Sequence, residues 1–294
     1  MGIKNIKKLL EKYPGVIRTE SITDLVDSRI AVDTPIYLSK YLYITLRDHF
    51  SNYSDEDILS FEELNSEVRR EIVDQVINRF MESFEIYSRV TGANFVMILE
   101  GPKTPEIKSH YAGARRLRDC DRFRERYRIY RRDCNVEGIR KVIGLIQDIS
   151  LTELTERLYE VIEKSAYECI KADGESERMA CILRENQMVD HVLTTDTDCL
   201  AMKQSMIINI DSRALEYTFI DYQQALENLS LTESQFTDLC IMSGCDYNDN
   251  IPRIGVMKAY KMIQEHGNIE NVGQVKDITI LNHEVCRRLF CLLE

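Results

Sequence analysis

Acidic residues follow short apolar runs at several points along this 294-residue sequence. The run Arg29–Val32 is followed by Asp33, and the run Phe95–Leu99 is followed by Glu100. Three later segments, Tyr167–Ile170, Val192–Thr195 and the helix-like Phe236–Met242, lead to Glu175, Glu177, Asp196, Asp198 and Asp246. Because the carboxyl ends of parallel strands lie together in an α/β sheet, these seven acids, the carboxylate cluster, are expected to meet at one edge.

The carboxylate cluster limits the chemistry that this edge can do. So many negative charges are not tolerated together without cations. Oxygen-only ligands suit Mg²⁺ or Mn²⁺, and paired acids can be shared between two such ions. Two ions can hold the attacking water and the leaving oxygen of an in-line displacement at phosphorus. One acidic pair alone is more typical of a solvated loop. The prediction of two-metal phosphodiester hydrolysis therefore depends on the recurrence of acids after several apolar runs.

A basic segment, residues 103–141, lies between the second and third of these runs. It contains thirteen basic and six acidic residues, so it carries a net charge of +7, although the whole chain carries −11. A positive element beside an acidic body is typical of polyanion binding. Lys108, Arg115 and Arg116 lie nearest to Glu100 and are predicted to stabilise charge on a phosphate. The alternative is a solvated helix with internal ion pairs.

The segments between these motifs predict an α/β fold. Strand-like runs alternate with helical patterns as far as residues 219–220, which indicates a parallel sheet with helices on both faces. Apolar spacing predicts helices over Ile36–Phe50 and Ser66–Thr91, and a mostly helical region over Leu231–Gly267. The basic segment does not fit the sheet and is interpreted as an insertion over its acidic edge.

The composition excludes several other functions. Nine cysteines without a C-x-x-C pair fit a reducing, intracellular compartment. The sequence shows no signal peptide and no membrane span. The five histidines form no zinc motif, and no phosphate-binding P-loop indicates ATP-driven work.

Several motifs together resemble one known family. They are Met1–Ile6, Glu100-Gly101, Gly174–Glu177, Thr195–Leu200 and Leu239–Tyr247. In order and spacing, from Met1 to about Val272, they resemble the flap endonucleases, which are structure-specific 5′ nucleases of the Rad2/XPG superfamily.

The resemblance implies a particular domain organisation. Residues 1–102 and 142–230 would form a PIN-like nuclease core with a parallel-rich sheet flanked by helices. Residues 103–141 would form a basic helical arch. Residues 231–275 would form a helix-two-turn-helix region that holds duplex DNA, and residues 276–294 would form a C-terminal helix.

The resemblance also implies roles for individual residues. Asp33, Glu100, Glu175, Glu177, Asp196, Asp198 and Asp246 would bind two Mg²⁺ or Mn²⁺ ions. Lys108, Arg115, Asp196 and Asp198 would be catalytic. DNA would be contacted by Gly2, Tyr37, Tyr41, Arg116, Arg118, Arg253, Gly255 and Lys258, with K⁺ at the helix-two-turn-helix. The tyrosine that stacks on a terminal base would be Tyr37 or Tyr41.

The sequence departs from the family pattern at three places. Glu100 stands where the family usually has Asp, and Arg253-Ile254-Gly255 replaces a Gly-x-Gly turn. No sliding-clamp peptide follows. This compact version resembles the enzymes of large DNA viruses.

The sequence therefore predicts a metal-dependent nuclease that cuts DNA at 5′ flaps or junctions during replication, repair or recombination. It would act as a monomer, without a membrane, in the nucleus or at a cytoplasmic replication site if viral. The alternatives are a PIN-type ribonuclease, a 5′ exonuclease, and a non-catalytic protein that binds DNA junctions.

Overall fold

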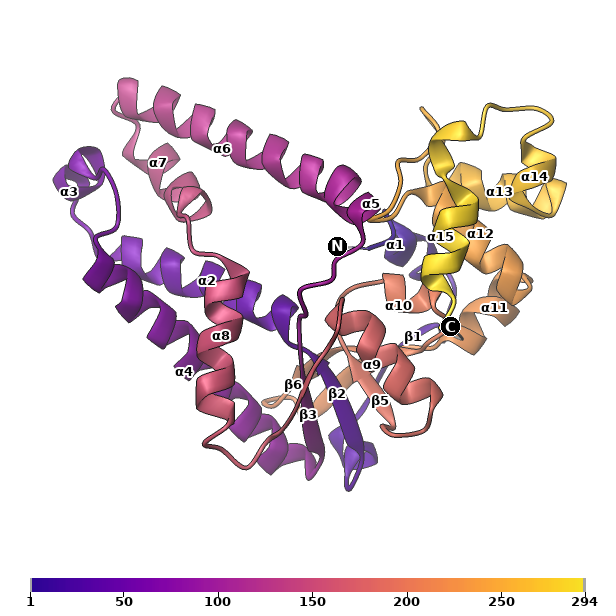
Figure 1. The fold of residues 1–294 in the computed structure, drawn as a ribbon, viewed down its shortest axis with the longest axis horizontal. Coiled ribbons are helices and arrows are strands. Elements are labelled where there is room, and N and C mark those ends of the chain that lie inside the picture. The colour runs from indigo at the N-terminus through magenta and orange to yellow at the C-terminus, as the bar shows by residue number, and fades with distance from the viewer. Residues whose placement is uncertain (1, 293–294) are drawn as a thin grey trace.

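A seven-stranded sheet forms the centre of the computed structural model, which describes residues 2–292 (Figure 1). Its strand order is β1-β7-β6-β5-β2-β3-β4. The strands are β1 (Ile17–Ser21), β2 (Arg29–Asp33), β3 (Asn94–Leu99), β4 (Glu168–Lys171), β5 (His191–Leu193), β6 (Met206–Asp211) and β7 (Glu216–Ile220). Met1, Leu293 and Glu294, which the sequence analysis placed in the core and the C-terminal helix, lie outside the described residues.

The middle of the sheet is parallel, as predicted, and one side is not. Strand β2 pairs in parallel with β3 and β5, β3 with β4, and β5 with β6. Strand β7 pairs antiparallel with β6 and with β1. The four residues between β6 and β7 form a turn in which the backbone amides of Arg213 and Ala214 donate to Asp211. So short a connection permits only an antiparallel pair, so the expectation of helices alternating with every strand is corrected here.

The central strands alternate their side chains between two apolar layers. Ala31, Val96 and Ile98 belong to one buried cluster, and Ile30 and Val32 belong to the other. This alternation follows from the two-residue period of a strand. Both faces are covered by helices, so β2 and β3 are apolar on both sides, as is typical of parallel strands.

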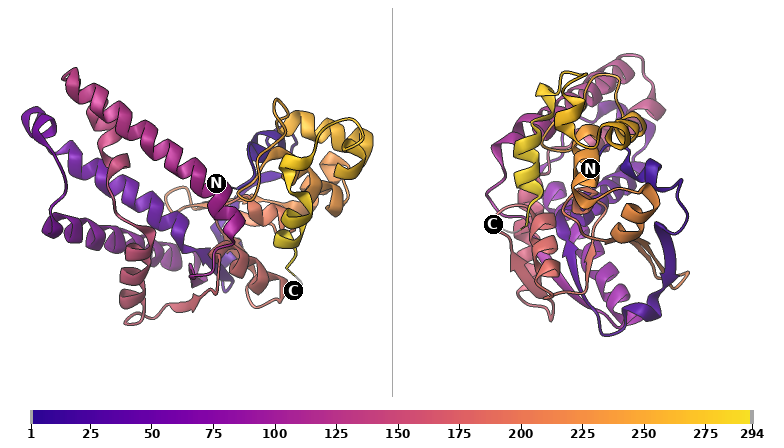
Figure 2. Two further views of the ribbon diagram at one scale, coloured as in Figure 1. Left: turned by 45° about the horizontal axis from the view of Figure 1, so that its top comes forward. Right: turned by 90° about the vertical axis from the view of Figure 1, so that its right-hand side faces the viewer.

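Long helices cover one face of the sheet. They are α2 (Thr34–Ser51), α4 (Ser66–Thr91) and α8 (Leu151–Ile162), with the shorter α3 (Asp55–Ser60) and α7 (Val136–Val142) beyond them. Helix α4 has the predicted bounds because its apolar residues recur at helical spacing, Asn65 caps its first turn and Gly92 ends it in the left-handed region. The left view in Figure 2 shows these helices extending to one side of the sheet.

The other face is covered by shorter helices. They are α1 (Ile6–Leu10), α9 (Ser176–Glu185), α10 (Asp198–Ala201), α11 (Tyr222–Leu229), α12 (Glu233–Ser243), α13 (Val256–His266), α14 (Ile269–Val272) and α15 (His283–Phe290). Their buried side chains join one cluster with Ala31, Val96 and Ile98. No helix among residues 2–292 has the length and apolar content that crossing a membrane requires.

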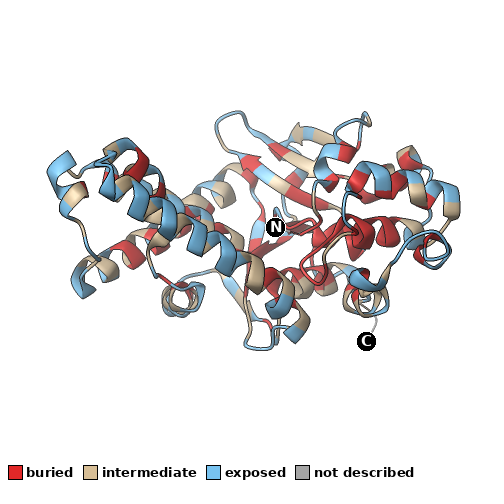
Figure 3. Ribbon diagram, turned by 90° about the horizontal axis from the view of Figure 1, so that it is seen from above, coloured by how far each residue is buried: buried red, intermediate tan, exposed pale blue. Residues whose placement is uncertain are grey.

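The basic segment is mostly helical. Its first part forms α5 (Glu106–Lys108), a π-helical turn at Ser109–Gly113 and α6 (Ala114–Arg132). The segment begins beside the sheet, and α6 leads away from it (Figure 1). No side chain of α6 is buried (Figure 3). Far from the sheet, the Tyr130 ring packs on Gly138 of α7, and the Tyr127 hydroxyl donates to the Phe61 carbonyl. Three i,i+3 ion pairs support the helix: Arg122–Asp119, Arg124–Asp121 and Arg128–Glu125.

Helix α15 is fixed to α12 by a buried ion pair. The Arg287 guanidinium donates to both carboxylate oxygens of Asp238, each at 2.8 Å, and it also pairs with Glu270. The Asp238 side chain is 1% exposed, whereas that of Arg287 is 32% exposed. Burial raises the pKa of Asp238, and the hydrogen bonds from Arg287 oppose that change.

We expect Arg287→Ala to lower the free energy of unfolding by about 2–3 kcal/mol, because it leaves a buried carboxylate without its cation. The loss should be below that for a fully buried pair, since the guanidinium is partly solvated. Adding Asp238→Asn should recover part of it. Urea unfolding measures both changes, with the exposed neighbour Arg288→Ala as the matched control. An equal loss in the control would contradict this role.

Candidate active site

The acid at the end of β2 and the acid after β3 share one partner on α9. The Ser176 hydroxyl donates to Asp33 Oδ1 at 2.7 Å, and the Ser176 amide donates to Glu100 Oε2 at 3.0 Å. The Thr194 hydroxyl, at the end of β5, donates to the second oxygen of Asp33 at 2.6 Å. Asp33 makes no capping bond to α2. Strand β2, the end of β5 and helix α9 therefore meet at Asp33, as is expected where the carboxyl ends of parallel strands lie together.

The loop after β5 carries the next two acids. The Asp198 amide donates to Asp196 Oδ1 at 3.0 Å, and the Thr194 hydroxyl accepts the Asp196 amide. Asp198 is fully buried, and both of its carboxylate oxygens have no hydrogen-bond partner in the structure. A buried carboxylate without a partner is costly, so these two oxygens are suited to a cation.

Lys108 of the basic segment lies between the two glutamates of α9. Its Nζ atom contacts Glu175 Oε1 and lies 2.9 Å from Glu177 Oε1, and the Tyr247 hydroxyl donates to the other oxygen of Glu175 at 2.7 Å. Lys108 is 8% exposed. Burial opposes its positive charge, but Glu177 and Glu175 outweigh that cost and hold the pKa of Lys108 above its ordinary value.

Arg115 joins the basic segment to the turn after α12. Its guanidinium donates to Asp246 Oδ1 at 3.1 Å, to the Cys245 carbonyl at 2.9 Å and to Asp249 at 3.3 Å. Seven residues separate Arg115 from Lys108, which would place both on one face of an α-helix. The π-helical turn between Lys108 and Arg115 widens the helix. Lys108 contacts Glu175 and Glu177, whereas Arg115 contacts Asp246.

The cluster carries more negative charge than its surroundings compensate. Burial, followed by the charge of Glu177, raises the pKa of Asp33 well above its usual range and that of Asp196 to about 7. Burial and the neighbouring Asp196 raise the pKa of Asp198 in the same direction. These shifts are expected for buried acids that lie close to one another.

The donor set fits hard divalent cations. It consists of carboxylates, with hydroxyls behind them, and contains neither sulfur nor imidazole. Among residues 2–292, no three acidic, histidine or cysteine side chains converge as a ready-made metal cage. Lys108 lies between Glu175 and Glu177 instead, so a metal bound there must take the place of its ammonium group.

The chain's second residue lies against the cluster. Gly2 has φ 79°, and a Cβ atom added to it would overlap the Asp196 carboxylate and lie 2.8 Å from the Asp198 amide nitrogen. The next residue, Ile3, donates its amide to the Thr197 hydroxyl at 2.8 Å. Only glycine fits there, and the structure places Gly2 at the acids themselves.

The two tyrosines proposed to stack on DNA are buried. Tyr37 is 5% exposed and packs edge-on against Phe84, and Tyr41 is 7% exposed and packs edge-on against Phe80. Both rings belong to the core between α2 and α4. Because both rings are buried in this apolar core, neither offers a face to a DNA base, and the prediction that one of them stacks on DNA is corrected.

The predicted duplex-binding turn lies between α12 and α13. Arg253 adopts φ 65°, the left-handed region that glycine adopts at little cost, and Gly255 is the N-cap of α13 with extended backbone. Lys258 donates to the Arg253 carbonyl at 3.1 Å. The Asn250 side chain donates hydrogen bonds to the backbone carbonyl oxygens of Ile251 and Ile254 in this turn.

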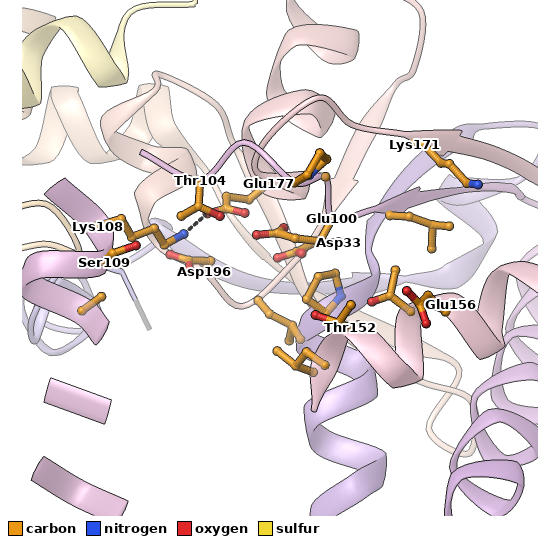
Figure 4. A pocket seen from close by; sticks show the side chains of 18 of the residues that line it. Asp33, Glu100, Thr104, Lys108, Ser109, Thr152, Glu156, Lys171, Glu177 and Asp196 are labelled. Atoms are coloured by element: carbon orange, nitrogen blue, oxygen red, sulfur yellow. Dashed lines mark hydrogen bonds and ion pairs between the residues drawn. The ribbon is translucent and has the colours of Figure 1, made fainter. Parts of the chain in front are cut away.

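A cavity of about 970 Å³ opens between the cluster and the basic segment. Asp33, Glu100, Glu177 and Asp196 line it on one side, and Lys108 and Arg116 line it from the basic segment. Figure 4 shows the four acids close to Lys108, with Lys171 farther away. Arg118 is exposed on α6 and does not line the cavity.

Sequence reasoning missed the neutral side chains that hold the acids. Ser176 lies inside the motif Gly174–Glu177, and Thr194 lies directly before the motif Thr195–Leu200. Tyr247 follows Asp246 directly. Their proximity to the acidic motifs was the available signal, although spacing alone does not identify a hydrogen-bond donor.

The chain is similar in sequence to known nucleases. The XPG I-region family matches residues 167–246. The probable RAD2-like endonuclease 369L of Invertebrate iridescent virus 6 is 28% identical, over 99% of this chain and 79% of its own length. Flap endonuclease 1-B of Oryza sativa subsp. japonica is 27% identical, over 93% of this chain and 64% of its own.

The chain is thus similar in sequence to Rad2-like and flap endonucleases. The predicted fold is confirmed by two solved structures. The catalytic core of Rad2 in complex with DNA substrate superposes with a TM-score of 0.65 at 17% identity, covering 98% of this chain and 79% of that one. Flap endonuclease-1 from Methanococcus jannaschii gives 0.65 at 17% identity, covering 96% and 82%. The chain spans 64% of the length of the rice relative and 79% of the length of the viral one.

We expect Lys108→Met to lower the free energy of unfolding in metal-free buffer by about 3–5 kcal/mol, because two buried glutamates lose their cation. Ca²⁺ should then stabilise the variant more than the native protein, since no ammonium competes for those oxygens. Thermal unfolding with and without Ca²⁺ measures this. Lys103→Met, which removes an exposed ion pair with Asp173, is the control. Equal Ca²⁺ shifts in all three proteins would contradict the argument.

Proposed function

We propose that this chain is a metal-dependent 5′ nuclease that hydrolyses DNA phosphodiester bonds at junctions between single and double strands. One observation carries the proposal: Lys108 and Arg115, from the basic segment, both lie in ion pairs with acids of the carboxylate cluster. Cations beside a metal-binding acidic edge suit a phosphodiester, because its charge grows in the transition state.

Each part of the site then has a role. The seven acids of the carboxylate cluster would hold two Mg²⁺ or Mn²⁺ ions. Such ions supply an activated water and neutralise developing charge when they are bound. Lys108 and Arg115 exchange their carboxylate partners for phosphate oxygens as DNA enters. Asp196 and Asp198, both buried beside Gly2, would hold the ions that position the reacting phosphate.

Two surfaces would hold the DNA on either side of the cut. Arg116 and Arg118 of α6 would contact the single strand, and the turn at Arg253–Gly255 with Lys258 would contact the duplex, with K⁺ in the helix-two-turn-helix region. Because one chain contributes both surfaces, a monomer suffices. DNA with 5′ flaps or junctions is the proposed substrate, supported by solved family members in complex with DNA substrate. The nucleus, or a viral replication site in the cytoplasm, is the proposed location.

We expect a 5′-flap DNA labelled at its end to be cut near the junction in Mg²⁺, faster than a matched blunt duplex or single strand. Asp196→Asn should reduce cleavage by at least about 100-fold, because it removes a carboxylate on which the charge balance depends. Binding of the flap in Ca²⁺ should stay within about threefold. The exposed Asp24→Asn is the matched control.

Other outcomes identify the alternatives. An Asp196→Asn variant that keeps a tenth of the activity would count against the assignment. Preferential degradation of a matched RNA flap would indicate a ribonuclease, and cutting only from free ends would indicate a 5′ exonuclease. Tight flap binding without cleavage in Mg²⁺ or Mn²⁺ would identify a non-catalytic junction binder.

A further inference from the structure

The cavity continues past the acids along one face of α8. Thr152, Glu156 and Tyr159 follow one another at i, i+4 and i+7, and all three line the cavity. Figure 4 shows Thr152 and Glu156 on the side of the cavity away from Lys108. None of these residues holds the carboxylate cluster in place, so this face of α8 is available for another task.

Apolar side chains border the same space from two elements. Leu117 of α6 is 67% exposed and Leu151 of α8 is 36% exposed, and both line the cavity together with Ile36 of α2. A leucine exposed to this extent beside a cavity is typical of a binding surface when its neighbours are polar. Flat apolar contact beside a few polar groups is what a nucleobase requires.

The far end of the cavity carries a positive charge. Lys171, the last residue of β4, lies with its Nζ atom 3.1 Å from the centroid of the Tyr159 ring. The ring attracts the ammonium group through its negative face and fixes its position. An exposed cation fixed beside the cavity is suited to a backbone phosphate. The cavity thus offers apolar, carboxylate and cationic contacts in a continuous space with the acidic edge.

We propose that this α8 face, defined by Thr152, Glu156, Tyr159 and Lys171, binds one unpaired nucleotide of the 5′ strand and prefers guanine. The proposal rests on the proposed function for its substrate. Lys171 takes the phosphate, and the leucines contact the base. A cavity of about 970 Å³ has room for one nucleotide and the strand that leads from it.

Glu156 decides the base preference. A carboxylate accepts hydrogen bonds through two adjacent oxygens, and it has no proton to donate. Guanine is the base whose Watson–Crick edge presents two adjacent N–H donors. Adenine and cytosine offer one amino group beside an acceptor, and thymine places carbonyls on both sides of its single N–H. Guanine therefore matches Glu156 best and thymine matches it worst.

The test uses 5′-flap DNAs with all-thymine flaps, in which one of the first three unpaired positions is changed in turn to guanine, cytosine, adenine or hypoxanthine. Binding is measured in Ca²⁺ and cleavage in Mg²⁺. At one position, guanine should bind on the order of tenfold more tightly than thymine. Hypoxanthine, which lacks the 2-amino group, should lose most of that advantage.

Two variants and one control locate the effect. Glu156→Ala should abolish the guanine preference, whereas Glu85→Ala, an exposed glutamate in the middle of α4, should leave it unchanged. Lys171→Ala should weaken binding of all flaps alike and reduce the salt dependence by about one phosphate contact. Both sites are exposed, and matching thermal unfolding midpoints would confirm that the variants fold.

The outcomes separate this proposal from the proposed function. Flap cleavage without any base preference, or with a preference that Glu156→Ala keeps, would overturn the subsite and leave the nuclease assignment standing. A guanine preference in binding that depends on Glu156 supports the subsite, even where no DNA is cut and the nuclease assignment fails.

Discussion

The buried contact between Lys108 and two glutamates is the constraint on which this structure depends. Seven acids at one sheet edge repel one another, and protein oxygens alone do not compensate them. Lys108 supplies one positive charge at Glu175 and Glu177, and the chain achieves this by bringing the basic segment back over the sheet. Whatever cation binds these oxygens competes with Lys108, so occupancy of the acids and docking of the basic segment are thermodynamically linked.

Arg115 extends the same ionic network to a third region. It contacts Asp246 and the carbonyls of the turn that leads to α13, and Lys4 pairs with Asp249 of that turn at 3.0 Å. Shared charges therefore hold the sheet edge, the basic segment and the turn before α13 together, in addition to the apolar cluster that includes Ile254 and against which Ile107 packs. Exposed ion pairs are weak and screened by salt, whereas the buried ones are not. A polyanion that enters can therefore displace the outer contacts first.

Sequence predicted the parts of this fold that depend on local pattern. Helix α4 and the ends of β2 and β3 follow from periodicity and from capping residues near them in sequence. The antiparallel β6–β7 pair, the burial of Tyr37 and Tyr41, and the support of Asp33 by Thr194 did not follow. The tyrosine burial and the support of Asp33 are decided by residues distant in sequence, since a tyrosine in an amphipathic helix has the same spacing whether it meets Phe84 or DNA. The β6–β7 pair is decided by the short turn between the two strands, which the sequence reasoning did not identify.

The Glu100 departure from the family pattern has a structural reason. The Ser176 hydroxyl lies 2.7 Å from Asp33 and 3.1 Å from Glu100, but it has one proton, which goes to the closer oxygen. Glu100 instead receives the Ser176 amide at the start of α9, where helix dipoles favour negative charge. The added methylene lets the carboxylate reach that amide. A backbone donor thus keeps the longer acid at the carboxylate cluster, so this substitution does not argue against the proposed metal site.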